Sequence, residues 1–578
     1  MKTTTRILRI ALLVLIPAGC KRTQVPTVQT PLSPPGIYTT QSATCSNGMV
    51  VSTSGLSSGV GVSILKQGGN AVDAAVATAF SLVVTHPPAG NLGGGGFMLV
   101  HPAPGGGDPV AFDYRETAPA ASTPNMFTKA DTMYEPKAVA TPGTLRGLEL
   151  AHRRFGTLPW SQLVLPAVAM ARDGIRVESY LAESLNTYLS NEPKLAEFQR
   201  VFGKPDGSPW VAGDLLVQPD LARTLQLVAD LGPDVFYTGP IAADIVAEMQ
   251  RGNGLVTAQD LAAYQAVERK PLTTKYRGKY EVIVPPAPSA GGICLLEELN
   301  MLEAFDLQAW GRWSPATLHV MAEAMRRANY DRARYIGDPA FVTIPPELIA
   351  PEYGRQLAAT INPGKATRSE DLSADIPISH ESQDTTHFSI IDAKGMAVSN
   401  TYTLERLWGS RIVVMGRGFL LNNNMFGFNH FPGRTDTQGM IGTAPNNIAP
   451  GKRPISSMTP AIVTENGRVR LVTGSPGSQG IPHTLLGIMV GVFDFHMSLQ
   501  EAIEAPRLSH QWFPDEITFE APERYPELVK ALQAMGHTVV RTGPRPQGAA
   551  HSILAEKPNQ YLGVADLRRT HQATAAGY

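Results

Sequence analysis

The sequence lacks the cysteines and the charge excess that mark several protein classes. Its 578 residues include three cysteines, Cys20, Cys45 and Cys294, which are too few for a disulfide framework and fit no metal-binding spacing. The formal net charge is -1 with acids and bases intermixed, so no nucleic-acid partner is expected. Because 43% of the residues are hydrophobic and 17% are charged, the chain is expected to be globular. Its fold must therefore depend on core packing.

The apolar run near the N-terminus is short. Basic residues precede the apolar run 10–16, which is too short to span a bilayer as a mature helix. Residues 1–20 are therefore predicted to be a signal peptide. Small residues before Cys20 resemble a bacterial lipobox, which would make Cys20 a lipidated N-terminus. Pro17 stands where that pattern prefers leucine, so plain signal cleavage remains open. Residues 21–42 are rich in Thr, Pro, Ser and Gln and are predicted to form a flexible tether.

After this tether, helical and strand patterns are mixed, which predicts a layered α/β fold. Apolar spacing predicts helices over 56–67, 71–84, 145–154, 160–172, 221–231, 241–251, 294–305, 316–335, 481–493, 499–505 and 526–535. Strands are predicted over 97–101, 110–114, 280–284, 386–391, 396–402, 419–421, 461–463, 469–472, 538–540 and 552–554. A run of glycines at 93–96 has no following lysine, so it is interpreted as backbone turning at close quarters rather than a phosphate loop.

The stretch from Asp384 to Asp392 carries the most specific chemistry. A threonine hydroxyl is a poor nucleophile unless a base lies beside it, and cleavage before the threonine would make its own α-amino group that base. A free α-amino group titrates near pH 7.7–8.0, so it can accept a proton near neutrality. Asp384 and Thr385 form such a junction at the start of a predicted strand. No metal or cofactor would then be needed. His387 is given no proton-transfer role, because a buried structural histidine is the commoner case.

Other polar residues could complete a site around Thr385. The turn 474–478 precedes a helix, and its backbone N–H groups could form an oxyanion hole. Arg115, at the end of a predicted strand, could hold a carboxylate in a bidentate pair, or could simply form a surface ion pair with Glu116. Ser456 and Ser457 offer two hydroxyls.

Taken together, the motifs resemble those of the γ-glutamyltranspeptidase family from about residue 48 to residue 578. The matching stretches, in chain order, are "GGNAVDAAVA", "GGGGFMLV", "DYRETAPA", "YRGKYEVIVPP", "DTTHFSIID", "TYTLE", "GFLLNN", "PGKRPISSMTP", "LVTGSPGS" and the terminal "GY". So many ordered motifs make coincidence implausible.

This resemblance implies an N-terminal-nucleophile hydrolase with a four-layer αββα sandwich. The chain would cut itself between Asp384 and Thr385, giving a large subunit over 43–384 and a small catalytic subunit over 385–578 that stay together as a heterodimer. Thr385 would form an acyl-enzyme with a γ-glutamyl group from glutathione or another γ-glutamyl amide, and water or an amino acid or peptide would release it. By motif position, the supporting threonine is Thr403, the oxyanion-hole residues are Gly477 and Ser478, and the α-carboxylate ligands are Arg115, Ser456 and Ser457.

The sequence departs from the family pattern where the substrate's α-amino group would bind. Glu405 replaces the usual Asn, Asn424 replaces Gln or Glu, and Gly427 replaces Asp. Losing a carboxylate removes a charge-assisted bond worth roughly 1.5–3 kcal/mol, although Glu405 could replace it in part. A pocket without that acid would also suit the glutaryl group handled by cephalosporin acylases of the same superfamily. Ser478 replaces a second glycine, a change that backbone donors should tolerate.

Three hypotheses follow from these residues. The leading one is an exported, periplasmic γ-glutamyltransferase and glutathione hydrolase, anchored by lipid if Cys20 is modified. The second is an acylase for glutaryl or other dicarboxylic amides. The third is a catalytically silent, exported binding protein that keeps the fold.

Overall fold

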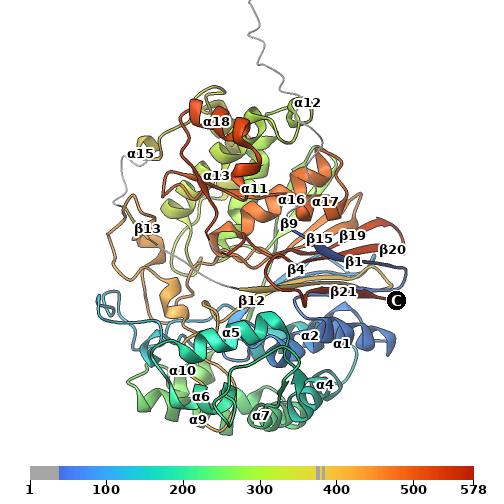
Figure 1. The fold of residues 1–578 in the computed structure, drawn as a ribbon, viewed down its shortest axis with the longest axis vertical. Coiled ribbons are helices and arrows are strands. Elements are labelled where there is room, and N and C mark those ends of the chain that lie inside the picture. Colours follow the sequence, from blue (N-terminus) through green and yellow to red (C-terminus); the bar gives the residue numbers. More distant parts are fainter. Residues whose placement is uncertain (1–37, 373–377, 381–384, 544) are drawn as a thin grey trace, which may run out of the picture.

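Two seven-stranded sheets lie face to face between two layers of helices (Figure 1). The computed structural model describes residues 38–372, 378–380, 385–543 and 545–578, with the backbone alone at 378–380. The predicted signal peptide, Cys20 and Asp384 lie outside the described residues. The predicted αββα sandwich is confirmed, because an apolar cluster fills each of the three interlayer spaces.

The first sheet contains the predicted nucleophile strand near its centre. Its order is β21 (Thr574–Gly577), β2 (Met49–Ser52), β11 (Thr386–Ile391), β12 (Ala397–Thr403), β3 (Gly95–His101), β4 (Val110–Asp113) and β7 (Val267–Arg269). All of these neighbours pair antiparallel. Because β11 is hydrogen-bonded on both sides and wholly buried, the residue that precedes it is held at the end of a rigid element.

The second sheet combines strands from both ends of the chain. Its order is β1 (Thr40–Cys45), β20 (Gln560–Asp566), β19 (His551–Lys557), β15 (Arg468–Thr473), β14 (Ala461–Glu465), β9 (Tyr280–Val284) and β8 (Leu272–Tyr276). The predicted tether boundary is wrong at its C-terminal end, because Thr40–Cys45 pairs in register with β20. Those polar residues form an edge strand that no apolar alternation announces. Cys45, in β1, and Cys294 are free thiols.

The helices divide between the two outer faces (Figure 1). Those on the first sheet's side are α1 (Gly55–Lys66), α2 (Ala71–Thr85), α3 (Thr144–Phe155), α4 (Trp160–Asp173), α5 (Ser179–Ser190), α6 (Ala196–Phe202), α7 (Pro219–Leu231), α8 (Asp234–Tyr237), α9 (Pro240–Arg251) and α10 (Ala258–Ala263). On the other side lie α11 (Ala290–Leu302), α12 (Leu307–Trp310), α13 (Pro315–Tyr335), α14 (Pro351–Ala359), α15 (Ser369–Leu372), α16 (Ile481–Phe493), α17 (Leu499–Glu504) and α18 (Pro526–Ala534).

Two short strand pairs and one three-stranded sheet complete the architecture. The pairs are β5 (Ile175–Arg176) with β6 (Leu215–Leu216) and β10 (Ile378–His380) with β13 (Met440–Ile441). The three-stranded sheet contains β16 (Leu508–Ser509), β17 (Ile517–Phe519) and β18 (Val539–Arg541). The strand predicted over 419–421 is wrong, because Leu420 and Leu421 form isolated bridges only. Its apolar residues are buried against the first helical layer rather than in a sheet.

The glycine run at 93–96 allows the backbone to approach β12 closely, as its interpretation as a turn region predicted. A Cβ on Gly94 would stand 2.0 Å from the carbonyl oxygen of Thr403, and one on Gly96 would stand 2.4 Å from that of Thr401. Any side chain there would push β12 away from β3. The glycine run therefore lets β3 pack closely against the C-terminal end of β12, which carries Thr403.

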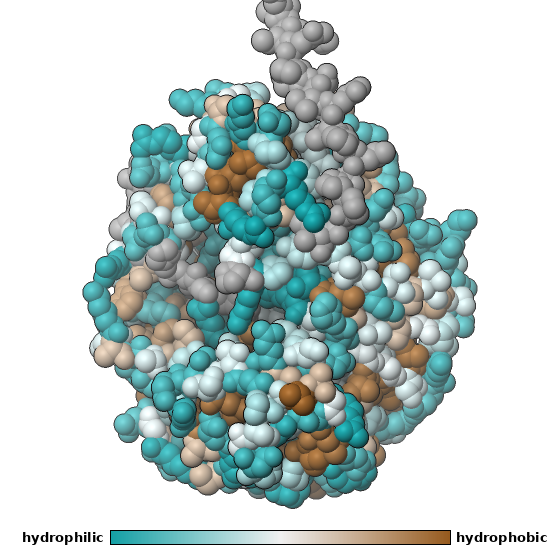
Figure 2. All heavy atoms as spheres, in the orientation of Figure 1, coloured by the Kyte–Doolittle hydropathy of each residue, from teal (hydrophilic) through white to brown (hydrophobic). Residues whose placement is uncertain are grey.

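The molecular face in Figure 2 is mainly hydrophilic, with hydrophobic residues in small separate groups. Large exposed apolar side chains include Leu165, Val211, Leu215, Val217 and Leu231. Among the helices that the structure describes, none combines the length and the hydrophobicity needed to cross a membrane.

Candidate active site

Thr385 lies at the start of β11 and faces a cavity of about 290 Å³. Thr385 as a whole is 8% exposed, so the residue is nearly enclosed. Thr386, Leu407 and Pro476 line the same cavity. A rigid strand end that opens into a cavity is the setting that a threonine nucleophile requires.

Thr403 ends β12, the neighbour of β11. The register pairs Thr386 with Tyr402, so its continuation brings Thr403 opposite Thr385. The Thr403 hydroxyl accepts a hydrogen bond of 2.8 Å from the backbone N–H of Glu405. One threonine thus connects the predicted nucleophile to a predicted substrate-binding residue.

The backbone conformation of Glu405 is unusual for its residue type. Its φ of 83° lies in the left-handed region, which asparagine tolerates better than a longer side chain does. Holding glutamate there costs of order 1 kcal/mol or more, which the surrounding contacts must offset. A strained residue beside the predicted nucleophile is a feature typical of functional sites.

The predicted oxyanion turn lies against the nucleophile strand. Gly477 has a φ of 136° and Ser478 a φ of 61°, where η5 (Ser478–Gly480) begins. A Cβ on Gly474 would stand 2.2 Å from Cε1 of His387, so the imidazole packs on the first residue of the turn. The His387 ring is further held by Thr401 at 2.8 Å. His387 therefore positions the turn relative to β11, a structural role that its spacing from Thr385 did not reveal.

Arg115 is fully buried and is held by two carboxylates and two carbonyls. Its guanidinium lies 3.1 Å from Glu116 and 3.3 Å from Glu405. It also donates to the carbonyl oxygens of Pro454 at 3.3 Å and Ile455 at 3.2 Å. The alternative of a surface ion pair is wrong, because Arg115 and Glu116 both have 0% exposure. These four partners all belong to the protein, so the guanidinium is desolvated and paired rather than hydrated.

The remaining predicted substrate ligands gather around this arginine. Ser456 and Ser457 are buried and directly follow the two carbonyls that hold the guanidinium. Asn424 donates to Glu116 at 2.5 Å, and its own side-chain oxygen has no hydrogen-bond partner among the described residues. A Cβ on Gly427 would stand 3.0 Å from Arg115 Nη2. The structure therefore brings the predicted substrate-binding residues into one cluster, here called the acyl-binding cluster after its predicted role.

Glu116 is the member of this cluster that sequence reasoning undervalued. Burial raises the pKa of Glu116 to about 7, and Arg115 lowers it only in part. Above that pH Glu116 is mainly ionised, and below it the residue is mainly neutral. The residue's place directly after Arg115 was the available signal, but a local pattern does not reveal burial.

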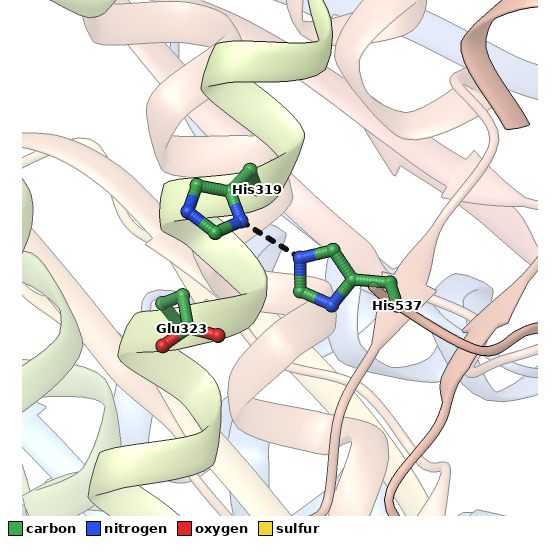
Figure 3. Close-up of side chains that lie close together, drawn as sticks. All are labelled: His319, Glu323 and His537. Carbon is green, nitrogen blue, oxygen red and sulfur yellow. Dashed lines mark hydrogen bonds between the residues drawn. The ribbon is translucent and has the colours of Figure 1, made fainter. Parts of the chain in front are cut away.

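A second polar cluster lies between α13 and the loop before β18 (Figure 3). His319 and Glu323 lie one turn apart on α13, and His537 approaches from the loop before β18. Residues of these types can bind a metal ion. The His319 Nδ1 and His537 Nε2 atoms are 2.7 Å apart and share a hydrogen bond. His319 Nε2 donates to the Asn362 carbonyl at 2.8 Å, so His319 Nδ1 is the acceptor within the pair.

The donor set of this cluster does not fit a metal ion. Arg326 and Arg327 both donate to the Glu323 carboxylate, which also accepts from Thr367 at 3.0 and 2.6 Å. A cation would lie beside two guanidinium groups and would have to displace these bonds. Arg326 also donates to Ser369 Oγ at 3.1 Å. The cluster therefore anchors the turn at 367–369 and is structural.

This cluster predicts that stability falls in mild acid. Burial lowers the pKa of His537 from 6.5 to about 3 and that of His510 to about 4. An unfolded chain would bind those protons from pH 6.5 downward, so stability is full above pH 6.5 and is lost as the pH falls toward these values. For His537, the free energy of unfolding is expected to fall by about 2 kcal/mol between pH 6.5 and pH 4.5.

The measurement is the free energy of unfolding in urea at both pH values. His537→Gln is expected to reduce the acid-dependent loss, and His571→Gln, which changes an exposed histidine, serves as the control. Equal pH dependence in all three proteins would contradict the assignment.

The chain is similar to known proteins over most of its length. Residues 57–576 match the family described as gamma-glutamyltranspeptidase. A glutathione hydrolase proenzyme from Escherichia coli (strain K12) is 43% identical over 540 residues, covering 92% of each chain. The acylase ACY 1 proenzyme of Pseudomonas sp. (strain SE83) is 38% identical, covering 90% of this chain and 92% of that protein.

The fold of this chain is also similar to that of a solved structure. The crystal structure of cephalosporin acylase from Bacillus halodurans has a TM-score of 0.82 at 25% identity, covering 95% of this chain and 99% of that one. Both γ-glutamyl and acylase relatives therefore share this fold. The match across nearly the full sequence shows that the chain belongs to the γ-glutamyltranspeptidase family.

Proposed function

We propose that this protein is a γ-glutamyltransferase and glutathione hydrolase that acts through Thr385 after cleavage of the bond before it. The observation that carries the proposal is the charge of the acyl-binding cluster, in which Arg115 pairs with both Glu116 and Glu405. An α-amino acid head group offers one carboxylate and one ammonium. Arg115 would bind the carboxylate, and a glutamate would bind the ammonium.

The same charges disfavour the glutaryl alternative. A glutaryl group lacks the ammonium, so its carboxylate would enter a cluster in which two buried acids, Glu116 and Glu405, already face the one guanidinium. Like charges in a buried site repel strongly. Gly427 and the acylase relative are the reasons for considering an acylase. Glu405, however, would supply the acid that is missing at position 427.

The proposed reaction uses residues with separate roles. The Thr385 oxygen adds to the γ-carbonyl carbon, and its proton passes through the new α-amino group to the leaving amide nitrogen. Backbone N–H groups at Gly477 and Ser478 would stabilise the oxyanion, and Thr403 would orient Thr385. The C–N bond breaks and an ester forms on Thr385. Water or an amine then attacks that ester and restores the free hydroxyl.

The direct test compares two acyl groups on one leaving group. Purified, processed enzyme is expected to release p-nitroaniline from the L-γ-glutamyl anilide at least about tenfold faster than from the glutaryl anilide, at equal low concentration. The readout is kcat/KM for each compound. A preference for the glutaryl compound would support the acylase, and no release from either would support a silent binding protein.

We also propose that the protein is exported to the periplasm, with Cys20 as a lipid-anchor site. The support is the basic and apolar N-terminal pattern ahead of Cys20 and the polar stretch that follows it. Fractionation of cells expressing the full chain tests both parts. Membrane retention that Cys20→Ala abolishes would support lipidation, whereas soluble periplasmic protein in both cases would leave plain signal cleavage.

A further inference from the structure

The start of β11 is paired less completely on one side than on the other. With β12, the register extends to Thr386, which lies opposite Tyr402. With β2, it extends only to Phe388, which lies opposite Ser52, the last residue of β2. Residues 385–387 therefore extend beyond the last described pair with β2. Cleavage before Thr385 would make this stretch a chain end, and chain ends lose order unless other contacts hold them.

A side-chain contact holds the start of β11 on the β2 side. Thr53 lies in the turn between β2 and α1, with its Oγ1 atom 2.9 Å from Oγ1 of Thr386. The same Thr53 oxygen is 3.0 Å from Nε2 of His551, the first residue of β19. All three residues are buried, with at most 5% exposure. One hydroxyl group therefore connects the residue after Thr385 to the second sheet.

His551 is itself held by backbone hydrogen bonds on two sides. Its N–H donates to the carbonyl oxygen of Gly474, the first residue of the predicted oxyanion turn, at 3.2 Å. Its carbonyl oxygen accepts a hydrogen bond of 2.8 Å from Ser389 Oγ in β11. His551 is therefore a rigid attachment point, because its backbone is bonded both to the turn and to the nucleophile strand.

The direction of the side-chain hydrogen bonds follows from the tautomer of His551. Burial lowers the pKa of His551 to about 4, so the imidazole is neutral at pH 7 and carries one N–H. Its Nδ1 atom has no hydrogen-bond partner among the described residues. A buried N–H without an acceptor is rarer than a buried acceptor without a donor, so the hydrogen belongs on Nε2. His551 then donates to Thr53, and Thr53 can donate to Thr386.

We propose that Thr53 and His551 are positioning residues that hold the new N-terminus of the small subunit, and with it the Thr385 nucleophile, after cleavage. The inference rests on the proposed function and adds residues on which its nucleophile depends. Before cleavage, the peptide bond to Asp384 restrains Thr385 as well, so the contact through Thr386 matters most in the processed protein. Arg115 belongs to the separate acyl-binding cluster. Loss of the contact is therefore expected to lower kcat and to spare KM.

Thr53→Val tests the contact by removing the hydroxyl group while nearly keeping the side-chain volume. With L-γ-glutamyl-p-nitroanilide, the processed variant is expected to show a kcat about tenfold lower and a KM within about twofold of the unchanged enzyme. Thr53→Ser, which restores the hydroxyl group, is expected to recover most of the kcat. Self-cleavage is expected to be spared in Thr53→Val, because Thr385 is still restrained by its peptide bond at that stage.

His551 is tested by two substitutions that differ in hydrogen-bonding capacity. His551→Gln keeps a side-chain N–H that can donate to Thr53, whereas His551→Leu removes it. The kcat is expected to fall less in the glutamine variant than in the leucine variant. Equal losses in the two variants would overturn the role of His551.

Thr224→Val provides the matched control. Thr224 is also fully buried, donates a hydrogen bond of 2.8 Å to the Arg417 carbonyl and is not among the described residues that line the cavity. It is expected to leave kcat unchanged, even if both valine variants lower the free energy of unfolding. An unchanged kcat in Thr53→Val, a loss confined to KM, or no recovery in Thr53→Ser would overturn the inference.

A second readout needs no substrate. Amide hydrogen exchange is measured in the processed protein, in the peptide that begins at Thr385. Exchange there is expected to be severalfold faster in Thr53→Val than in the unchanged enzyme or in Thr224→Val. Equal exchange rates would overturn the inference. A processed protein inactive toward γ-glutamyl compounds would refute the proposed function alone, whereas an uncut protein would refute both.

Discussion

Replacing Thr385 by alanine is expected to leave an uncut chain with at least about a thousandfold lower activity. The hydroxyl group is both the nucleophile for the proposed substrate and the group that would attack the preceding peptide bond. Without it, neither the ester nor the new α-amino group can form. Intact mass and N-terminal sequencing check the first part, and release of p-nitroaniline checks the second.

Thr385→Ser supplies the matched control because it keeps a hydroxyl at the start of β11. It is expected to yield two fragments, one of them beginning at residue 385 and containing 194 residues, from 385 to 578. If the unchanged protein also stayed as one chain after secretion, Thr385 would not be a competent nucleophile. The silent binding protein would then become the better hypothesis.

Glu405→Gln is expected to lower kcat/KM for γ-glutamyl substrates about tenfold to a hundredfold, the equivalent of the roughly 1.5–3 kcal/mol of a charge-assisted bond. The physical reason is the loss of the carboxylate that lies 3.3 Å from Arg115 and would turn to the substrate ammonium. The glutaryl anilide has no ammonium and should be spared. The measured quantity is therefore the ratio of kcat/KM values for the two anilides.

Gly427→Asp separates this explanation from its alternative. An acid there would begin 3.0 Å from Arg115 Nη2, close to the guanidinium that should bind the substrate. It is expected to add little γ-glutamyl activity while Glu405 is present. A large gain from Gly427→Asp, or an unchanged ratio in Glu405→Gln, would show that Glu405 does not perform the role of the missing acid.

Local patterns correctly predicted the elements that hold the site. Apolar spacing placed the strand at 386–391 and the helix at 481–493 with the bounds that the structure has. The edge strand Thr40–Cys45 was missed because its side chains are polar and half-exposed. Its pairing partner, β20, comes more than 500 residues later, and no local signal encodes such a pairing.

The roles of the oxyanion turn and of Ser456 and Ser457 remain predictions. Asp384 and Cys20 lie outside the described residues, so the cleavage and lipidation sites remain predictions as well. The fold explains why the first group could be named in advance. Each residue lies within a short motif of adjacent residues.

The sequence by itself determined the family, the threonine at a cleavable junction and the strand that carries it, because these depend on short stretches of adjacent residues. Only the tertiary structure decided the charge of the acyl-binding cluster. It buries Glu116 beside Arg115 and brings Glu405 to the same guanidinium from 290 residues away. It also brings Arg545 and Arg569 to the cavity that Thr385 lines. Burial and distance set the strength of these charges, and both arise from the packing of layers rather than from residue order.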